Sequence, residues 1–446
     1  MKKAALAAAV AAAAAGGVIV AIVLASTSGG STSAPPPKTR ERAGPATGTT
    51  TTSTAGPSPA TLRSATAPVD TQTLDLPPPP SPRSTRKRTF VVGVVDDALA
   101  QRDARFTRAQ VQLSRGAGFD AAAVTATWHP GERRPAASLV RVLRNVARAA
   151  RAADMRFVVV VWNGLGRDTP RTPADRADFA AYAGALVGAL PTVRHVVVGN
   201  EPNLSTFWQP QFGAGGRDLA AFAYADLLAR SYDAIKAANP AVRVLGGAVS
   251  PRGADRPGGL RPTHSPTAFI RDLGSAYRAS GRDKPFMDAF AFHPYMQASR
   301  IRPAAAHPRN TSITIADYPK LVALLKEAFD GTAQPGERLP IYYTEFGVQT
   351  RVPGEKLHFY EDHDSPASTD SVSFELQAAY YRRALALAYC QPTVRGLFIF
   401  HTFDETRLSG WQSGLYFVDR TPKPSLRPFR RAVADLRSGK LARCSR

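Results

Sequence analysis

The sequence HVVVGNEP occupies residues 195–202 and joins an apolar run to a glutamate and a proline. Its three valines favour a strand, because β-branched side chains pack well on a pleated surface. Glu201 then follows at the point where such a strand ends. A second run, IYYTE at residues 341–345, has the same plan and ends in Glu345. A buried strand holds a side chain at its carboxyl end with little freedom, so the two runs predict two fixed carboxyl groups.

Eight short β-rich runs alternate with helical stretches after Arg88. The predicted strands are Phe90–Val95, Ala121–Thr127, Phe157–Trp162, His195–Gly199, Val242–Gly247, Ala289–His293, Ile341–Glu345 and Gly396–His401. The predicted helices include Leu139–Ala153, Leu219–Ala238, Tyr318–Phe329 and Phe374–Tyr389. Eight such units over about 350 residues predict an α/β fold, a (β/α)8 TIM barrel spanning residues 89–438. The alternative is an open doubly wound sheet, but no glycine-rich phosphate loop follows the first run.

Polar or aromatic residues follow nearly every predicted strand, and barrel enzymes place their sites at these carboxyl ends. The strand ends carry Asp96-Asp97, Trp128-His129, Trp162-Asn163, Asn200-Glu201, His293 with Tyr295, Glu345, and His401 with Asp404-Glu405. Three tryptophans lie on or just after strand ends: Trp128, Trp162 and Trp208. Their indole rings either stack on the C–H face of a sugar or pack a loop. Asn163 and His401 are further candidates for substrate contact.

This arrangement resembles the retaining β-glycosidases of the large (β/α)8 clan called clan A, which includes cellulases, mannanases and xylosidases. The resemblance covers residues 89–438 and rests on Asn-Glu-Pro after strand four with a glutamate ending strand seven. It implies that Glu201 is the general acid/base and Glu345 the nucleophile, with no cofactor. It also implies that Asn200 binds the sugar 2-hydroxyl, that His293 belongs to the site, and that the Tyr295 hydroxyl orients the nucleophile.

The chemistry of a carboxyl pair fits these implied roles. A retaining mechanism requires two carboxyl groups ~5 to 5.5 Å apart, one ionised for attack and one protonated to release the leaving oxygen. Burial and neighbouring negative charge raise the pKa of one group above that of the other. Each residue also has a simpler interpretation: Asn200 as the cap of a helix-entry turn, His293 as a core histidine, and Tyr295 as a rim aromatic.

The chain departs from the clan pattern at two strand ends. Trp128-His129 stands where many members carry an arginine, and Phe400-His401 stands where many carry a tryptophan, while Trp411 follows only later. These differences leave the catalytic pair in place but leave the sugar open. The expected activity is therefore cleavage of a β-glycosidic bond in an unspecified carbohydrate. The alternative function is a non-catalytic carbohydrate-binding or cell-wall-associated barrel, which has no need for both glutamates.

The N-terminal residues predict export. Two lysines precede 21 uncharged residues, Ala4–Leu24, so residues 1–25 form either a signal peptide or an N-terminal membrane anchor. Both versions place the rest of the chain outside the cytoplasm, as an extracellular or cell-surface protein. Residues 26–88 are rich in Pro, Ser and Thr and predict a disordered linker. Residues 439–446 form a C-terminal tail.

The net charge of +22 is spread along the chain. Residues 1–88 hold 10 Lys or Arg and 3 Asp or Glu, so +7 lies there and +15 in the rest. Without a basic stripe interleaved with aromatics, nucleic-acid binding is not expected. The charge indicates either electrostatic association with an anionic cell-wall polymer or membrane surface, or an arginine-rich composition bias. The charge also raises the possibility that the substrate is an anionic glycan. We expect the protein to be a monomer.

Two further features leave alternatives open. Cys390 and Cys444 are the only cysteines, and an exported protein is expected to join them in a disulfide, whereas two free buried thiols are the alternative. The segment His358–Asp364 contains two histidines and three carboxylates. No second cluster completes a metal site there, so we expect no bound metal and predict a loop that gates the substrate.

Overall fold

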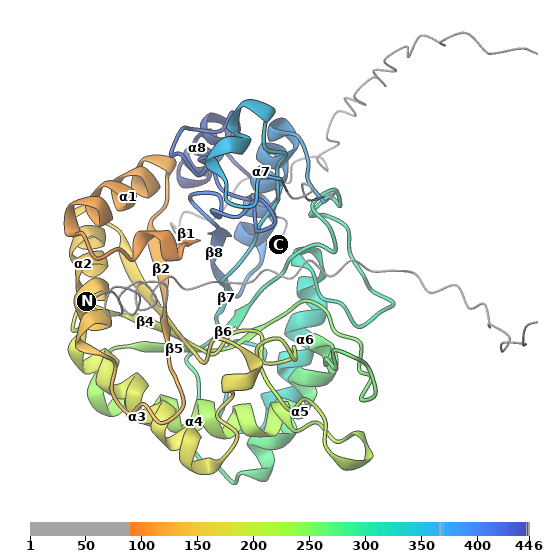
Figure 1. The fold of residues 1–446 in the computed structure, drawn as a ribbon. Helices are drawn as coiled ribbons and strands as arrows, with labels where there is room; N and C mark the ends of the chain where they lie inside the picture. Colours follow the sequence, from red (N-terminus) through yellow and green to blue (C-terminus); the bar gives the residue numbers. More distant parts are fainter. Residues whose placement is uncertain (1–89, 365–367, 369, 443, 445–446) are drawn as a thin grey trace, which may run out of the picture. The chain divides into compact units, whose positions relative to one another are not determined.

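Eight parallel strands pair in chain order and close into a barrel, with β1 hydrogen-bonded to β8 (Figure 1). The strands are β1 Val91–Val95, β2 Ala121–Thr127, β3 Arg156–Trp162, β4 His195–Val198, β5 Arg243–Val249, β6 Ala289–Phe292, β7 Ile341–Tyr343 and β8 Val394–Phe400. The helices are α1 Ala104–Ala117, α2 Ala137–Ala152, α3 Pro173–Ala189, α4 Ala220–Ala238, α5 Pro266–Ala279, α6 Tyr318–Phe329, α7 Phe374–Cys390 and α8 Leu426–Arg437. This computed structural model confirms the predicted (β/α)8 barrel and excludes the open sheet.

The structure describes residues 90–364, 368, 370–442 and 444. The predicted export segment at residues 1–25 and the linker at residues 26–88 lie outside this range. None of the helices within it is long and apolar enough to cross a bilayer.

Several predicted strands were too long or began elsewhere. β4 ends at Val198 and β7 at Tyr343, so both glutamates lie in the loops that follow rather than on the strands. The backbone leaves the extended conformation there, since Gly199 has φ +85° and Glu201 has φ +40°. β5 runs from Arg243 to Val249 instead of residues 242–247. The strand interiors, set by β-branched and apolar residues, were placed correctly.

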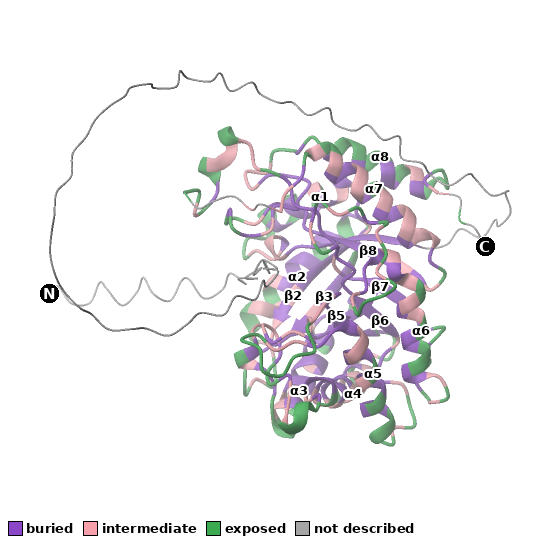
Figure 2. Ribbon diagram, turned by 90° about the vertical axis from the view of Figure 1, so that its right-hand side faces the viewer, coloured by how far each residue is buried: buried purple, intermediate pink, exposed green. Residues whose placement is uncertain are grey.

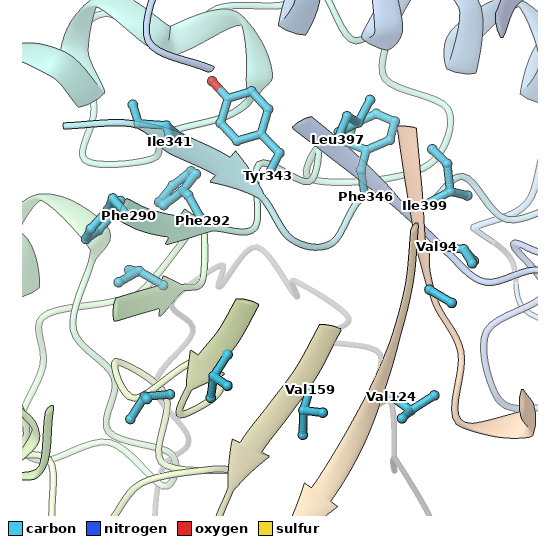
Figure 3. Close-up of a cluster of buried hydrophobic side chains, with 14 of the residues drawn as sticks. Val94, Val124, Val159, Phe290, Phe292, Ile341, Tyr343, Phe346, Leu397 and Ile399 are labelled. Atoms are coloured by element: carbon cyan, nitrogen blue, oxygen red, sulfur yellow. The ribbon is translucent and has the colours of Figure 1, made fainter. Parts of the chain in front are cut away.

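Alternation along each strand divides its side chains between two cores. One set points outward and packs under the helices, including Val124 on β2, Val159 on β3 and Phe292 on β6 (Figure 3). The other set fills the barrel interior, including Ala123 on β2 and Val158 on β3. Figure 2 shows the strands buried behind helices whose outward faces are exposed. Because both faces of every strand are covered, the sequences of the strands are nearly continuous runs of apolar residues.

Side-chain caps fix where the crossover helices begin. The Thr172 hydroxyl accepts from the Asp175 amide while the Asp175 carboxylate accepts from the Thr172 amide, and Pro173 opens α3. Ser265 caps α5 in the same position relative to Pro266. These caps satisfy amide groups that the first helical turn cannot pair, so the loops that lead into α3 and α5 have a defined end.

A disulfide joins the end of α7 to the C-terminal tail. Cys390 and Cys444 are 54 residues apart in the chain, and their Cα atoms lie 5.0 Å apart. The bond encloses β8, the loop that follows it and α8. The alternative of two free thiols is therefore not what the structure contains.

Candidate active site

The loop after β4 holds Glu201 in a strained but well-supported conformation. Its backbone N–H donates to the Ala248 carbonyl at 2.8 Å, and the Gly199 N–H donates to Val161 at 2.7 Å. Gly199 lies against the Tyr224 ring, where a Cβ would come within 2.8 Å of a ring carbon, so only glycine fits. The loop therefore presents Glu201 to the barrel mouth in one orientation.

His293 connects the two glutamates. Its Nδ1 lies 3.0 Å from Glu201 Oε1 and 3.5 Å from Glu345 Oε2. Since both oxygens lie this close to one atom, the two distances limit their separation to about 6.5 Å, at the lower edge of the roughly 6.5 to 9.5 Å of inverting enzymes. The side chains of Glu201 and Glu345 are 13% and 18% exposed, so both carboxyl groups reach the cleft. The structure thus places both carboxyl groups next to the same nitrogen of His293.

Tyr295 positions Glu345 from the other side. Its hydroxyl donates to Glu345 Oε2 at 3.1 Å. The tyrosine ring stacks on Phe346, with the centroids 6.4 Å apart, and also contacts Trp411 at 5.2 Å. Burial and the Glu345 charge raise the pKa of Tyr295, so its hydroxyl keeps its proton and remains a donor.

The charges around Glu345 act in opposite directions. Burial raises the pKa of Glu345 to about 7, and the negative charges of Glu201 and Asp97 act in the same direction. The His293 charge and the Tyr295 hydrogen bond lower that pKa. Burial lowers the pKa of His293, but the charges of both glutamates outweigh it and raise the pKa. The pKa of Glu345 therefore lies above that of a free glutamate, because burial outweighs the effects of His293 and Tyr295.

Three residues near the site, Trp411, Glu405 and Asp97, had no role predicted from the sequence. Trp411 lies against Tyr295 and also contacts Phe400, with ring centroids 5.7 Å apart, and it is partly exposed to the cleft. Its backbone N–H donates to Glu405 Oε2 at 3.1 Å, and burial raises the pKa of Glu405 to about 7. Asp97 accepts from the Thr125 amide at 2.7 Å. Trp411 supplies an indole ring near the end of strand eight, where the strand itself ends in Phe400 rather than a tryptophan.

Two of the predicted stacking tryptophans lie inside the protein. Trp128 is 0% exposed, donates from Nε1 to the Glu132 carbonyl at 2.7 Å and packs on Phe179. Trp208 is 2% exposed and meets Tyr224 edge-on. Protein atoms cover both rings, so the structure does not support sugar stacking by either one. Both rings pack the loops instead, which was the alternative interpretation.

Asn163 and Trp162, two other predicted substrate contacts, differ in whether their hydrogen-bond donors already have partners in the protein. Asn163 is buried and donates to the carbonyls of Leu165 and Phe207, so it anchors the loop after β3. Trp162 packs on Phe207 beside it, and its Nε1 has no partner among the residues that the structure describes. The Trp162 indole N–H is thus buried without a partner among the described residues, whereas the Asn163 amide is already engaged.

Asn200 and His401 complete the predicted set. Asn200 is half-buried beside Glu201, and within the described part of the chain its side chain makes no hydrogen bond, so it is free to bind a hydroxyl group. His401 is buried, and its burial lowers its pKa to about 3, so the ring is neutral. It lies against Phe400, with ring centroids 3.5 Å apart.

The segment His358–Asp364 is tied to the loop after β8. Asp362 accepts from the Leu408 amide and the Ser409 hydroxyl, both at 2.6 Å, while Tyr360 donates to Asp404 at 2.7 Å. Over the described residues, no group of three or more His, Cys, Asp or Glu side chains is placed to hold a metal ion. Asp362 therefore has a structural role, since it joins this segment to the loop after β8.

The fold is similar to that of solved glycoside hydrolases. The chain is similar to a family 39 glycoside hydrolase from Bacteroides cellulosilyticus WH2, with TM-score 0.56 and 21% identity over 79% of this chain, and it spans 64% of that protein. A family 5 subfamily 18 enzyme from Streptomyces cattleya, solved with mannosyl-β-1,4-GlcNAc, gives TM-score 0.52 at 18% identity over 78% of this chain and 81% of the other. A subfamily 18 enzyme from Bifidobacterium longum subsp. infantis gives TM-score 0.54 at 14% identity over 78% and 79%.

Sequence comparison adds nothing to this likeness, since no family model and no curated protein sequence matches the chain. At such identities the likeness establishes the fold, which is a clan A-like (β/α)8 barrel of the kind found in glycoside hydrolases. The resemblance expected from Asn-Glu-Pro and Glu345 is confirmed at that level.

Proposed function

We propose that this protein is an exported retaining glycoside hydrolase that cleaves a β-glycosidic bond in a polysaccharide or oligosaccharide. The observation that carries the proposal is the contact of one His293 nitrogen with both Glu201 and Glu345, at 3.0 and 3.5 Å. Since the two carboxyl oxygens lie no more than about 6.5 Å apart, at the lower edge of the roughly 6.5 to 9.5 Å of inverting enzymes, the geometry favours the retaining mechanism.

In the first step, ionised Glu345 attacks the anomeric carbon while Glu201 gives its proton to the departing glycosidic oxygen. The bond from carbon to the leaving group breaks as the bond to Glu345 forms, giving a covalent glycosyl-enzyme. Glu201, now ionised, removes a proton from a water molecule, and that water releases the sugar from Glu345. The sugar thus keeps its original anomeric configuration.

The neighbouring residues support these two roles. Tyr295 fixes the Glu345 oxygen that it binds, and its hydrogen bond favours the ionised form that attack requires. His293 places positive charge beside both carboxyl groups, which stabilises the negative charge on Glu345 before attack and on Glu201 once it has given up its proton. Asn200 and Trp411 supply an amide and an aromatic face for the sugar.

Export is supported by the disulfide between Cys390 and Cys444, because such bonds persist mainly in oxidising compartments. The basic and apolar residues 1–25 provide the corresponding signal or anchor. Detection of the full-length protein in the cell-surface or culture fraction, rather than in the cytoplasm, tests the location.

A panel of aryl β-glycosides, followed by proton NMR of the first product formed, tests the activity and its stereochemistry. A 2-fluoro derivative of the best substrate should lose its leaving group and add the mass of the fluorinated sugar to the peptide that contains Glu345. Product of inverted configuration, or labelling of another residue, would contradict the mechanism.

A further inference from the structure

Three neighbouring helices carry most of the positive charge of the helical layer. α8, α1 and α2 follow β8, β1 and β2, which are hydrogen-bonded neighbours, so these helices lie side by side around β1 (Figure 1). Together they hold eleven arginines and one carboxylate, Asp435, for a net charge of +10. The other five helices hold nine Lys or Arg and seven Asp or Glu, for a net charge of +2. An arginine-rich composition would raise the charge of all eight helices, so composition alone does not explain this concentration.

The arginines lie on the outward faces of these helices. Arg141, Arg144, Arg148 and Arg151 are spaced three or four residues apart on α2, which places them on one side of the helix, and all four are exposed. Leu143, between two of them, is fully buried on the opposite side. The exposed arginines of α1 and α8 that extend this surface are Arg105, Arg108, Arg427, Arg430 and Arg431. We call these nine arginines the basic face.

No carboxylate of the described residues forms an ion pair with an arginine of the basic face. The other two arginines of the three helices, Arg115 and Arg437, both pair with Asp120. The single carboxylate of the three helices, Asp435, pairs with Arg382 of α7. The fold therefore leaves nine neighbouring positive charges without a partner of its own. Such a surface repels itself and attracts an anionic partner.

The chain enters the barrel at the centre of the basic face. Phe90, the first described residue, leads into β1, which is the middle strand of the three that α8, α1 and α2 follow. The 89 residues before Phe90 contain Ala4–Leu24, the run that the sequence predicts to be part of a signal peptide or a membrane anchor. A tether from a bilayer would thus connect to the barrel at the strand that the arginine-bearing helices surround.

We propose that the basic face docks on a membrane surface rich in anionic phospholipid. The arginines are spread across three helices rather than along a single one, which suits an extended anionic surface more than a single polymer chain. Each arginine close to such a membrane contributes a factor of about five to the binding equilibrium. Because the helices flank the barrel while Glu201 and Glu345 lie at one end of it, docking through this face leaves the barrel mouth open.

Energy transfer from two surface labels to a dye in the membrane tests this proposal on the full-length chain. Gln112 is exposed on α1, within the basic face, and Ser275 is exposed on α5, which follows the strand opposite β1 in the closed barrel. Gln112→Cys and Ser275→Cys each give one reactive thiol, since Cys390 and Cys444 are joined. Each labelled protein is mixed with vesicles of phosphatidylglycerol and phosphatidylcholine, or of phosphatidylcholine alone.

On the anionic vesicles, transfer from residue 112 should exceed transfer from residue 275. The difference should be lost on phosphatidylcholine, which has no net charge. It should also be lost when NaCl is raised from about 0.15 to about 1 M, because the screening length then falls from about 8 to about 3 Å. Comparing two labels on the same chain separates docking of the basic face from attachment through residues 4–24, which affects both labelled proteins equally.

Two sets of four substitutions provide the variant and its matched control. Arginine-to-glutamine changes at residues 108, 141, 151 and 430 remove exposed side chains for which the structure gives no hydrogen bond, and they should weaken docking by roughly 10²- to 10³-fold. The same changes at residues 256, 261, 309 and 338 remove four exposed arginines from loops next to α5 and α6. The first set should abolish the difference between the labels, and the second should keep it.

Equal transfer from the two labels on anionic vesicles would overturn the proposal. An equal loss in the variant and its control would also overturn it, because net charge rather than the basic face would then be responsible. Binding of soluble polyphosphate to the wild-type protein, together with equal transfer on vesicles, would identify a polymer instead of a membrane as the partner. Thermal unfolding of each variant confirms that the compared proteins are folded.

Discussion

The Tyr295 hydroxyl donates to Glu345 Oε2 at 3.1 Å, and this hydrogen bond lowers the pKa of a carboxyl group that burial raises to about 7. Replacement of Tyr295 by phenylalanine removes the donor, so the pKa of Glu345 should rise further. Since attack requires the ionised form, the acidic limb of the kcat/KM profile should move to higher pH. The loss of a hydrogen bond to a charged group should also lower kcat/KM by about 10- to 100-fold at the optimum.

Tyr380→Phe is the control for that profile, because the Tyr380 hydroxyl donates to the Arg300 carbonyl at the surface of α7. Its profile should coincide with that of wild type. An unshifted acidic limb in Tyr295→Phe would show that the hydroxyl does not act on the ionisation of Glu345.

Glu201→Gln should shift the acidic limb in the other direction. The negative charge of Glu201 raises the pKa of Glu345, so removing it lowers that pKa and extends activity to lower pH. The basic limb, which reports loss of the acid proton, should disappear. For substrates with poor leaving groups kcat/KM should fall by roughly 10²- to 10⁴-fold, and by much less for dinitrophenyl glycosides, which need no protonation. An equal loss of kcat/KM for substrates with good and poor leaving groups would show that Glu201 is not the general acid.

Substitutions of Trp411 and Trp128 should distinguish a tryptophan that binds substrate from one that packs inside the protein. Trp411→Ala removes the partly exposed ring beside Tyr295, so KM should rise several-fold while the protein stays folded. Trp128→Phe removes a buried hydrogen bond and part of a buried ring, which should lower the free energy of unfolding by about 1 to 3 kcal/mol with little change in KM. Urea unfolding and steady-state kinetics on both variants measure the two effects. A raised KM in Trp128→Phe alone would reverse the assignment.

Side-chain alternation explains why one strand-end tryptophan lies in the mouth and another does not. On β2 the interior positions are Ala121 and Ala123, so Trp128 continues the outward set. On β3 the interior positions are Val158 and Val160, so Trp162 continues the inward set. The sequence contained this signal, because the period of two is readable once the strands are placed.

Trp411 carried no comparable signal. It lies in a long loop beyond the end of β8, where the backbone follows no period and contacts decide the position. Trp411 is placed by the hydrogen bond from its amide to Glu405. The catalytic pair was predictable because a parallel strand delivers its following residue to one end of the barrel. The surrounding specificity residues required the folded loops.

The disulfide between Cys390 and Cys444 should contribute to stability and not to catalysis. The bond closes a loop between two cysteines that are 54 residues apart in the sequence. Cys390 is the last residue of α7, at the end of the helix that lies away from the glutamates. Chain-entropy arguments for a loop of this length give a loss of at most about 4 kcal/mol in the free energy of unfolding when the bond is removed. Urea unfolding with and without reductant measures this loss. The double variant Cys390→Ser/Cys444→Ser should have the same free energy of unfolding as the reduced wild-type protein, and reductant should no longer change it. The double variant and the reduced protein should both keep the wild-type kcat/KM at urea concentrations below their unfolding transitions. A reductant effect that persists in the double variant would mean that the stabilisation comes from somewhere other than this bond.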